Sequence, residues 1–273
     1  MTNDMILQQL HTVLFEILCE FDRICRKHHI QYFLDSGTAL GAVRHGGFIP
    51  WDDDIDVGML RHEYEKFLIV AQNELSDKFF LLSPESDSAY MKYHAKLVKR
   101  NTIFPEKGTD NLKHRGIYID IFPFDKVSED SMTRKNVIRK VLLVRNFIRL
   151  KRTNNNGDGF SLKILCFLLK IIPLRLLESY QKKLWNHYNH TSSKYVTCYF
   201  YKMLVGRDLY FPISAMSPSI ETNFEGRTFM IMNGYNKYLK IMYNDYMQLP
   251  PEDKRTCHFN GDIIFDAVDT FND

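Results

Sequence analysis

Residues 32–58 decide the fold, and they read YFLDSGTALGAVRHGGFIPWDDDIDVG. The glycines of 37–41 and 46–47 mark two turns in which backbone amides can come close to a ligand. Directly after these turns comes an acidic run, which consists of Asp52, Asp53, Asp54 and Asp56. Glycine-rich turns followed by clustered carboxylates predict a site that binds phosphate and a metal ion.

The spacing of the carboxylates suits one metal ion. If Ile55 and Val57 form the buried face of a short strand, Asp54 and Asp56 share the opposite face and lie roughly 6.5 Å apart. Such a pair fits Mg²⁺, or Mn²⁺ in its place, because substrate phosphates and water can supply the remaining oxygens. An acidic run is more commonly a solvated loop, but the glycine turns and the alternating strand beside it favour a site.

A further carboxylate, Asp120, lies in the apolar strand predicted at 116–122. Burial of a lone charge is costly unless a metal ion or a partner compensates. Asp120 is therefore predicted to complete the metal site or to act as a base. The alternative is an aspartate at a strand end whose side chain is capped by backbone amides.

The order of the predicted elements favours one fold. A strand at 30–34, a Gly-Thr turn, a helix at 39–44 and a strand with the Asp-x-Asp pattern are typical of the nucleotidyltransferase fold. We expect an α+β protein, with a nucleotidyltransferase-like core of a small mixed sheet flanked by helices and a helical insertion. The catalytic core is expected at 1–129, the insertion at 130–200 and the part that completes the catalytic domain at 201–273.

The insertion contains two unusual segments. Residues 131–152 are predicted to form a helix rich in lysine and arginine. Residues 160–178 are amphipathic, but too short and too charged to span a bilayer. They are predicted either to contact a membrane surface peripherally or to pack as a pair of core helices.

Composition narrows the class of protein. The chain has 273 residues and a formal net charge of only +3, which gives no reason to expect a nucleic acid partner. Its five cysteines are scattered, without a zinc-binding spacing, and fit a reducing compartment. The first residues lack the features of a signal peptide. We expect a cytoplasmic protein, with contact at the inner membrane face through 160–178.

Several blocks of the sequence resemble the LicD family of phosphotransferases, which includes bacterial phosphocholine transferases and animal fukutin-related proteins. The first block is GTALGAVRHGGFIPWDDDIDVG at 37–58, and it is long and specific. The later blocks are KYHAKLVKRNTIF at 92–104, GIYIDIFPFD at 116–125 and FEGRTFMIMNGYNKYLKIMYNDYMQLPPEDKRTCHF at 224–259. Residues from roughly 130 to 200 resemble nothing that we can assign.

The resemblance implies a substrate pair. The donor would be CDP-choline, or alternatively a CDP-polyol with ribitol or glycerol, and the acceptor a glycan precursor on a lipid carrier, as for teichoic acid, capsule or lipopolysaccharide. The residues expected to bind metal and catalyse are Asp54, Asp56 and Asp120. The residues expected to bind substrate are Gly37, Thr38, Arg44, His45, Asp53, Lys96 and His258, with Lys96 chosen for a phosphate contact.

Two other classes of function are compatible with the same motifs. One is a catalytically idle protein that binds a nucleotide or glycan, although such a protein would not need all three of Asp54, Asp56 and Asp120. The other is a nucleotidyltransferase that acts on small molecules or RNA, although the near-neutral charge disfavours RNA.

Overall fold

The computed structural model describes residues 3–90, 92–106, 111–153, 172–201, 207–257 and 262–267. It consists of two compact units, one made of Met1–Pro123 with Ser214–Asp273 and the other of Phe124–Ile213. The boundaries expected from the sequence, 129/130 and 200/201, both fall inside the second unit.

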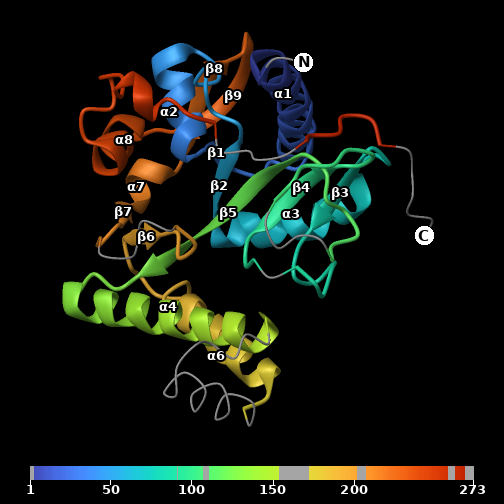
Figure 1. Ribbon diagram of the computed structural model, residues 1–273. Helices are drawn as coiled ribbons and strands as arrows, with labels where there is room; N and C mark the ends of the chain where they lie inside the picture. The colour runs from blue at the N-terminus through green and yellow to red at the C-terminus, as the bar shows by residue number, and fades with distance from the viewer. Residues whose placement is uncertain are drawn as a thin grey trace. The chain divides into compact units, whose positions relative to one another are not determined.

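The first unit is built on a mixed sheet with the strand order β3-β4-β5-β2-β1-β9-β8 (Figure 1). Its strands are β1 (Phe33–Leu34), β2 (Asp56–Leu60), β3 (Phe79–Leu82), β4 (Ala95–Lys99), the beginning of β5 (Tyr118–Val127), β8 (Ser219–Phe224) and β9 (Arg227–Met232). β1 pairs antiparallel with β2 and parallel with β9. The sheet and its helices confirm the expected α+β class.

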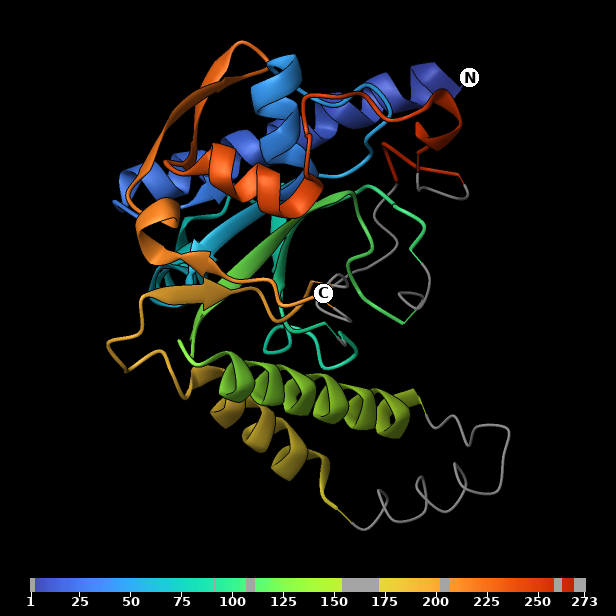
Figure 2. The ribbon, with the colours of Figure 1, turned by 90° about the vertical axis from the view of Figure 1, so that its left-hand side faces the viewer.

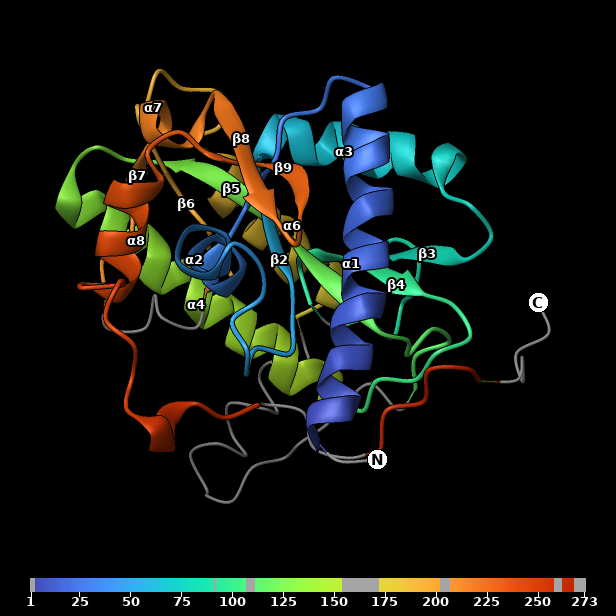
Figure 3. The ribbon, with the colours of Figure 1, turned by 90° about the horizontal axis from the view of Figure 1, so that it is seen from above.

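Helices cover this sheet in two pairs. The helices are α1 (Asn3–Lys27), α2 (Ser36–His45), α3 (Arg61–Glu74), α8 (Tyr235–Tyr243), the 3₁₀ turn η2 (Glu252–Lys254), and α7 (Ile213–Met216) at the boundary of the two units. α1 contacts α3, and α2 contacts α8. Figure 3 shows these two pairs on either side of strands β2, β8 and β9. The predicted helix at 39–44 begins earlier, at Ser36, because Asp35 caps it.

α1 forms because apolar side chains recur at helical spacing along one face. Its buried apolar residues are Leu7, Leu10, Leu14, Ile17, Leu18, Phe21, Ile24 and Cys25. The ring of Phe21 meets those of Tyr32 and Phe67, each at 4.9 Å between centroids. The helix therefore packs on α3, on β4 and on Tyr32, which precedes β1, as expected for an amphipathic element at the edge of a core.

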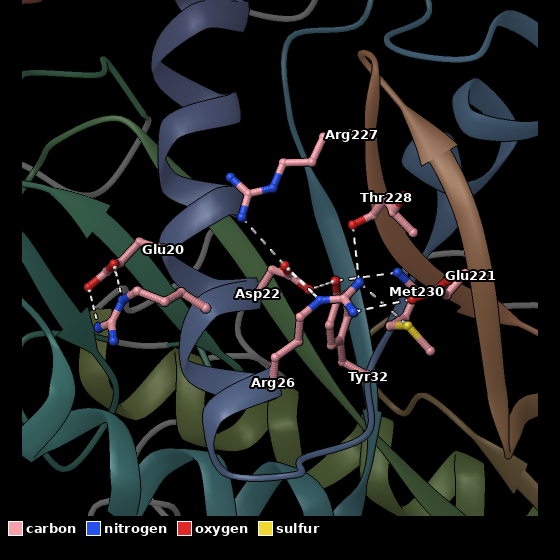
Figure 4. A network of polar contacts seen from close by, with 9 residues as sticks. Glu20, Asp22, Arg26, Tyr32, Glu221, Arg227, Thr228 and Met230 are labelled. Atoms are coloured by element: carbon pink, nitrogen blue, oxygen red, sulfur yellow. Dashed lines mark hydrogen bonds and ion pairs between the residues drawn. The ribbon is translucent and has the colours of Figure 1, made fainter.

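A buried carboxylate ties α1 to the sheet (Figure 4). The Asp22 carboxylate accepts a hydrogen bond from the Tyr32 hydroxyl at 2.6 Å and from Arg26 Nε at 2.9 Å. Arg26 also donates to the Thr228 carbonyl at 3.1 Å in β9. A charge that is paired and hydrogen-bonded in this way can be buried at acceptable cost, so the network fixes the position of β9 against α1.

The second unit contains a helical hairpin and a small sheet. α4 (Ser131–Thr153) and α6 (Leu174–Asn186) pack side by side (Figure 2). The end of β5 pairs with β6 (Tyr195–Thr197), which pairs with β7 (Phe211–Pro212). Among the helices of the described residues, none combines the length and the apolar character that a membrane span requires.

The strand β5 contradicts one prediction from the sequence. Pro123 predicts a turn at Asp125, but β5 continues past the proline to Val127, and Asp125 is fully buried. Its carboxylate accepts a hydrogen bond from Asn189 Nδ2 at 2.7 Å, and its backbone pairs with Thr197. A strand can continue through a proline where the ladder of hydrogen bonds requires no amide donor at that position.

Candidate active site

The acidic run lies where β2 begins, between β1 and β5. Ile55 and Val57 are fully buried, as predicted, while Asp54 is exposed and Asp56 half-buried. The amide of Asp56 donates to Thr38 Oγ1 at 2.9 Å, and its carbonyl accepts from the Asp35 amide at 2.9 Å. The start of α2 therefore holds the backbone of Asp56 from both sides.

The first turn of α2 is shaped to receive the acidic run. The Asp35 carboxylate caps the helix by accepting a hydrogen bond from the Ser36 amide at 2.8 Å, and it is itself held by the Tyr238 hydroxyl of α8. A Cβ atom at Gly37 would lie 2.7 Å from Asp52 Oδ2, so a larger residue there would displace the Asp52 carboxylate. Gly37 and Thr38 are thus engaged with the acidic run, and their contact with phosphate stays a prediction.

Residues far away in the sequence hold the loop that carries the aspartates. Glu225, at the tip of the β8–β9 hairpin, accepts a hydrogen bond from the Phe48 amide at 2.9 Å. His11 of α1 bonds the Asp52 carbonyl through Nε2 at 2.7 Å and stacks on the Phe48 ring at 4.0 Å. Sequence reasoning missed both residues, because nothing in their local pattern marks them.

Asp120 lies on the strand next to the acidic run. Its amide donates to the Ile55 carbonyl at 2.9 Å. Its carboxylate is bonded to His94 Nε2 at 2.8 Å and lies 3.8 Å from Lys96 Nζ, since β4 pairs Lys96 opposite Asp120. Asp120 is therefore a partnered and largely buried charge with a side chain 13% exposed, and its carboxylate is held by side chains of β4 and of the residue before it.

Lys96 is itself deeply buried, with 1% of its surface exposed. Its ammonium donates to Glu106 Oε2 at 2.7 Å and lies 3.1 Å from the centroid of the Tyr118 ring. In this structure Lys96 is the counter-ion of Glu106 and Asp120. Its predicted contact with phosphate stays a prediction.

The two carboxylates of the neighbouring strands have opposite electrostatic environments. Burial raises the pKa of Asp56 well above its usual range, and the charges of Asp54 and Asp120 raise it further. Burial also opposes the ionisation of Asp120, but Lys96 and His94 outweigh it and hold the pKa of Asp120 below its usual range. Burial, followed by the charges of Asp54 and Asp53, raises the pKa of Asp52 to about 8.

The donor set fits a hard divalent cation. Asp54 and Asp56 offer carboxylate oxygens, which Mg²⁺ and Mn²⁺ prefer, and the crowding of negative charge around Asp56 is what a cation would relieve. Within the described ranges, no three carboxylate, imidazole or thiol groups converge closely enough to hold a metal ion by themselves. The arrangement therefore fits an ion that also takes oxygens from substrate phosphates.

The remaining residues predicted to bind substrate are Arg44, His45, Asp53 and His258. Arg44 donates to the Tyr246 carbonyl at 2.9 Å, and the exposed His45 lies near Trp51, with 6.3 Å between ring centroids. Asp53 is buried within the acidic run. His258 lies outside the described residues.

Tyr243, in the last turn of α8, is a neighbour of the acidic run that sequence reasoning missed. Burial raises the pKa of its hydroxyl, and four carboxylates raise it further. These carboxylates are Asp35, Asp56, Asp52 and Asp54. Its place in a sequence block similar to the LicD family was the one available signal.

Comparisons with known proteins show which family the chain is similar to. The family model described as LicD/FKTN/FKRP, nucleotidyltransferase domain, matches residues 29–146. The "Lipopolysaccharide cholinephosphotransferase LicD" of Haemophilus influenzae is 31% identical over 264 residues, which cover 92% of this chain and 95% of the relative. The human "Ribitol 5-phosphate transferase FKRP" is 53% identical over 30 residues, 11% of this chain and 6% of that protein.

Proposed function

The chain belongs to the LicD family, and from that premise we propose that it transfers phosphocholine from CDP-choline to a sugar hydroxyl of a cell-surface glycan precursor. The chain is a phosphoryl-alcohol transferase that modifies glycans. The observation that carries the choice of phosphocholine is the similarity to the Haemophilus cholinephosphotransferase, which extends over 95% of that protein. A CDP-polyol donor is the alternative, from the short match to the ribitol 5-phosphate transferase.

The proposed reaction is an in-line displacement at phosphorus. The oxygen of the acceptor hydroxyl forms a bond to the phosphorus that carries choline, and the bond from that phosphorus to the bridging oxygen breaks. The leaving group is CMP, which keeps the bridging oxygen. The proton of the hydroxyl passes to a carboxylate of the site or to solvent.

The aspartates supply negative oxygens at this step. Asp54 and Asp56 would hold Mg²⁺ or Mn²⁺, which when bound would neutralise charge on the donor phosphates. Asp120 would complete the site or accept the proton of the acceptor hydroxyl. Because Lys96 and His94 keep its pKa low, its role as an anionic ligand is the better supported, since a general base works best with a pKa near the working pH.

The other predicted residues are proposed to contact the substrates. Amides of the turn at 37–38 would approach phosphate oxygens, while Arg44, His45 and Lys96 would contribute positive charge. Asp53 and His258 are retained as candidates for contact with the donor or acceptor.

We also propose that the second unit contacts an anionic membrane surface. α4 carries no acidic residue, and its exposed Lys135, Arg139 and Lys140 have no ion-pair partner among the described residues. On α6, Leu176 is 60% exposed and Tyr180 47%, one helical turn apart. Basic and apolar side chains on one hairpin suit anionic lipid headgroups. Residues 160–171, where this contact was also expected, lie outside the described residues.

The transfer is tested by measuring CMP release from CDP-choline, CDP-ribitol and CDP-glycerol. Each donor is supplied with Mg²⁺ or Mn²⁺ and a glycan acceptor, to the wild type, to Asp56→Asn and to a control, Asp77→Asn, on an exposed residue. We expect the wild type to release CMP from one donor, and we predict that this donor is CDP-choline. Asp56→Asn should lose this release, and Asp77→Asn should retain it. Release that persists in Asp56→Asn, or the absence of release from all three donors by folded protein, would contradict the proposal.

Membrane contact is tested by sedimentation with vesicles of phosphatidylglycerol and of phosphatidylcholine. We expect binding to the anionic vesicles that weakens in Leu176→Asp. Ile69→Asp is the matched control, since Ile69 of α3 is 69% exposed in the first unit. Equal sedimentation of all three proteins would argue against the hairpin as the contact.

A further inference from the structure

Two arginines from distant parts of the sequence are anchored on one short segment, residues 246–250. Arg44, in the last turn of α2, donates to the Tyr246 carbonyl at 2.9 Å and to the Gln248 carbonyl at 3.4 Å. Arg255, which follows η2, donates through Nε to the Pro250 carbonyl at 2.9 Å. Each guanidinium uses some of its five donors for this anchoring and keeps the others for a further acceptor.

The positive charge of this pair is poorly balanced. Among the described residues, Arg255 has one carboxylate at ion-pair distance, Glu252 at 3.8 Å, and the Glu252 side chain is 91% exposed. No carboxylate within the described ranges lies at ion-pair distance from Arg44, whose other polar neighbour is His45 at 3.5 Å. Burial lowers the pKa of Arg44, and the charge of Arg255 adds to this effect against the opposing influence of Tyr243.

The pair borders the acidic run. The guanidinium of Arg255 lies 5.4 Å from the centroid of the Trp51 ring, and Trp51 immediately precedes Asp52. Tyr243 is electrostatically coupled both to Arg44 and to the carboxylates of the run. A ligand that contacts the two arginines would therefore lie beside the aspartates.

We propose that Arg44 and Arg255 together form an anion site for the diphosphate group of the nucleotide donor. Planar guanidinium groups match phosphate oxygens with two parallel hydrogen bonds, and the Trp51 ring orients the guanidinium of Arg255. The identity of the ligand rests on the proposed function, whereas the anion site rests on the two arginines alone. Arg255 was not among the residues expected from the sequence, and it provides the second cation that Arg44 lacks within α2.

The site is tested by isothermal titration with inorganic pyrophosphate in the absence of divalent cations, so that the aspartates contribute no metal-mediated binding. We expect the wild type to bind and Arg255→Gln to bind on the order of tenfold more weakly, because a charge-assisted bidentate contact is lost. Arg255→Lys should be intermediate, since lysine keeps the charge but not the planar fork.

Arg100→Gln is the matched control. Arg100 is half-buried like Arg255, donates through Nε to the Phe79 carbonyl at 3.2 Å and lies 5.3 Å from the Phe80 ring, so it makes the same kinds of contact. The affinity of the Arg100→Gln variant for pyrophosphate should equal that of the wild type. The proposal is overturned if the wild type does not bind pyrophosphate, if Arg255→Gln binds as tightly, or if Arg100→Gln loses as much.

A parallel assay separates this proposal from the proposed function. The Michaelis constant for CDP-choline should rise on the order of tenfold in Arg255→Gln. If the wild type releases no CMP from any donor but binds pyrophosphate through Arg255, the proposed function fails and the anion site remains. If Arg255→Gln transfers with an unchanged Michaelis constant, the pair does not bind the donor. Arg44→Gln is a second variant, and Arg255→Gln decides alone should Arg44→Gln not fold.

Discussion

Asp56 and Asp120 lie on adjacent strands, yet their surroundings differ in almost every respect. Asp56 is surrounded by other carboxylates, which with burial raise its pKa. Asp120 is bonded to His94 and faces Lys96, which keep its pKa low despite burial. Asp120 has basic partners within the protein, whereas Asp56 is crowded by further carboxylates, and we propose that a bound cation completes its surroundings. Opposite environments around two neighbouring acids are typical of active sites in which the acids have different roles.

Neutralising the two acids should have opposite effects on stability. Asp56→Asn should reduce transfer by about 1,000-fold or more while leaving the free energy of unfolding unchanged or higher, because it removes repulsion between carboxylates. Asp120→Asn should also impair transfer, but it should destabilise the fold because Lys96 and His94 lose their anionic partner. Transfer assays and urea unfolding at pH 7.5 without divalent cations would measure both. Equal destabilisation by the two variants would refute the contrast.

Removing Lys96, the counter-ion of Asp120 and Glu106, should destabilise the fold and impair transfer. Lys96→Met should lower the free energy of unfolding by about 3 kcal/mol, because a nearly buried ion pair loses one member. Transfer should fall by about 10- to 100-fold, as when an outer residue that orients a ligand is lost. Lys92→Met is the control, since Lys92 also forms an ion pair with Glu106 but its side chain is 38% exposed. A Lys96→Met protein as stable as Lys92→Met would show that this pairing is unimportant.

The acidic run should give the metal-free protein an unusual dependence of stability on pH. With its pKa raised to about 8 in the folded state, Asp52 binds its proton more tightly there than in the unfolded chain. Stability should therefore fall as pH rises from about 4 to about 8, by up to about 1 kcal/mol per pH unit. Asp120 acts in the opposite sense, since its contribution is lost as pH falls below the usual carboxyl range.

Urea unfolding at pH 5, 6.5 and 8 would measure this slope in the wild type and in Asp52→Asn. We expect the decline to flatten in the variant. If both proteins show the same decline, Asp52 does not cause it.

The smallest expected effect concerns the link between α2 and β2. Thr38→Val removes the acceptor for the buried Asp56 amide and should lower the free energy of unfolding by about 1 kcal/mol. Thr38→Ser keeps the hydroxyl and should unfold like the wild type. If valine and serine at this position give the same stability, the hydrogen bond contributes nothing measurable.

Local patterns in the sequence predicted helices and strands well where residue type and the spacing of apolar residues favoured the same element. The helix predicted at 131–152 is found as α4, and the strand predicted at 116–122 overlaps β5, because apolar periodicity is encoded over a few neighbouring residues. The turn at Glu225-Gly226, with φ of 51° and 74°, joins β8 and β9. Predictions failed where pairing with a distant strand decided the outcome, as at Asp125.

Residues that are neighbours in the chain were sufficient to predict the family, the α+β class and the position of the acidic run. Which charges meet depends on how strands and loops that are distant in the sequence pack together. His94 and Lys96 face Asp120 because β4 and β5 pair in one register. Arg44 and Arg255 both donate hydrogen bonds to residues 246–250, a segment about 200 residues after α2 in the chain. The lowered pKa of Asp120 follows from such long-range contacts, whereas neighbours within the acidic run contribute, with burial, to the raised pKa values of Asp52 and Asp56.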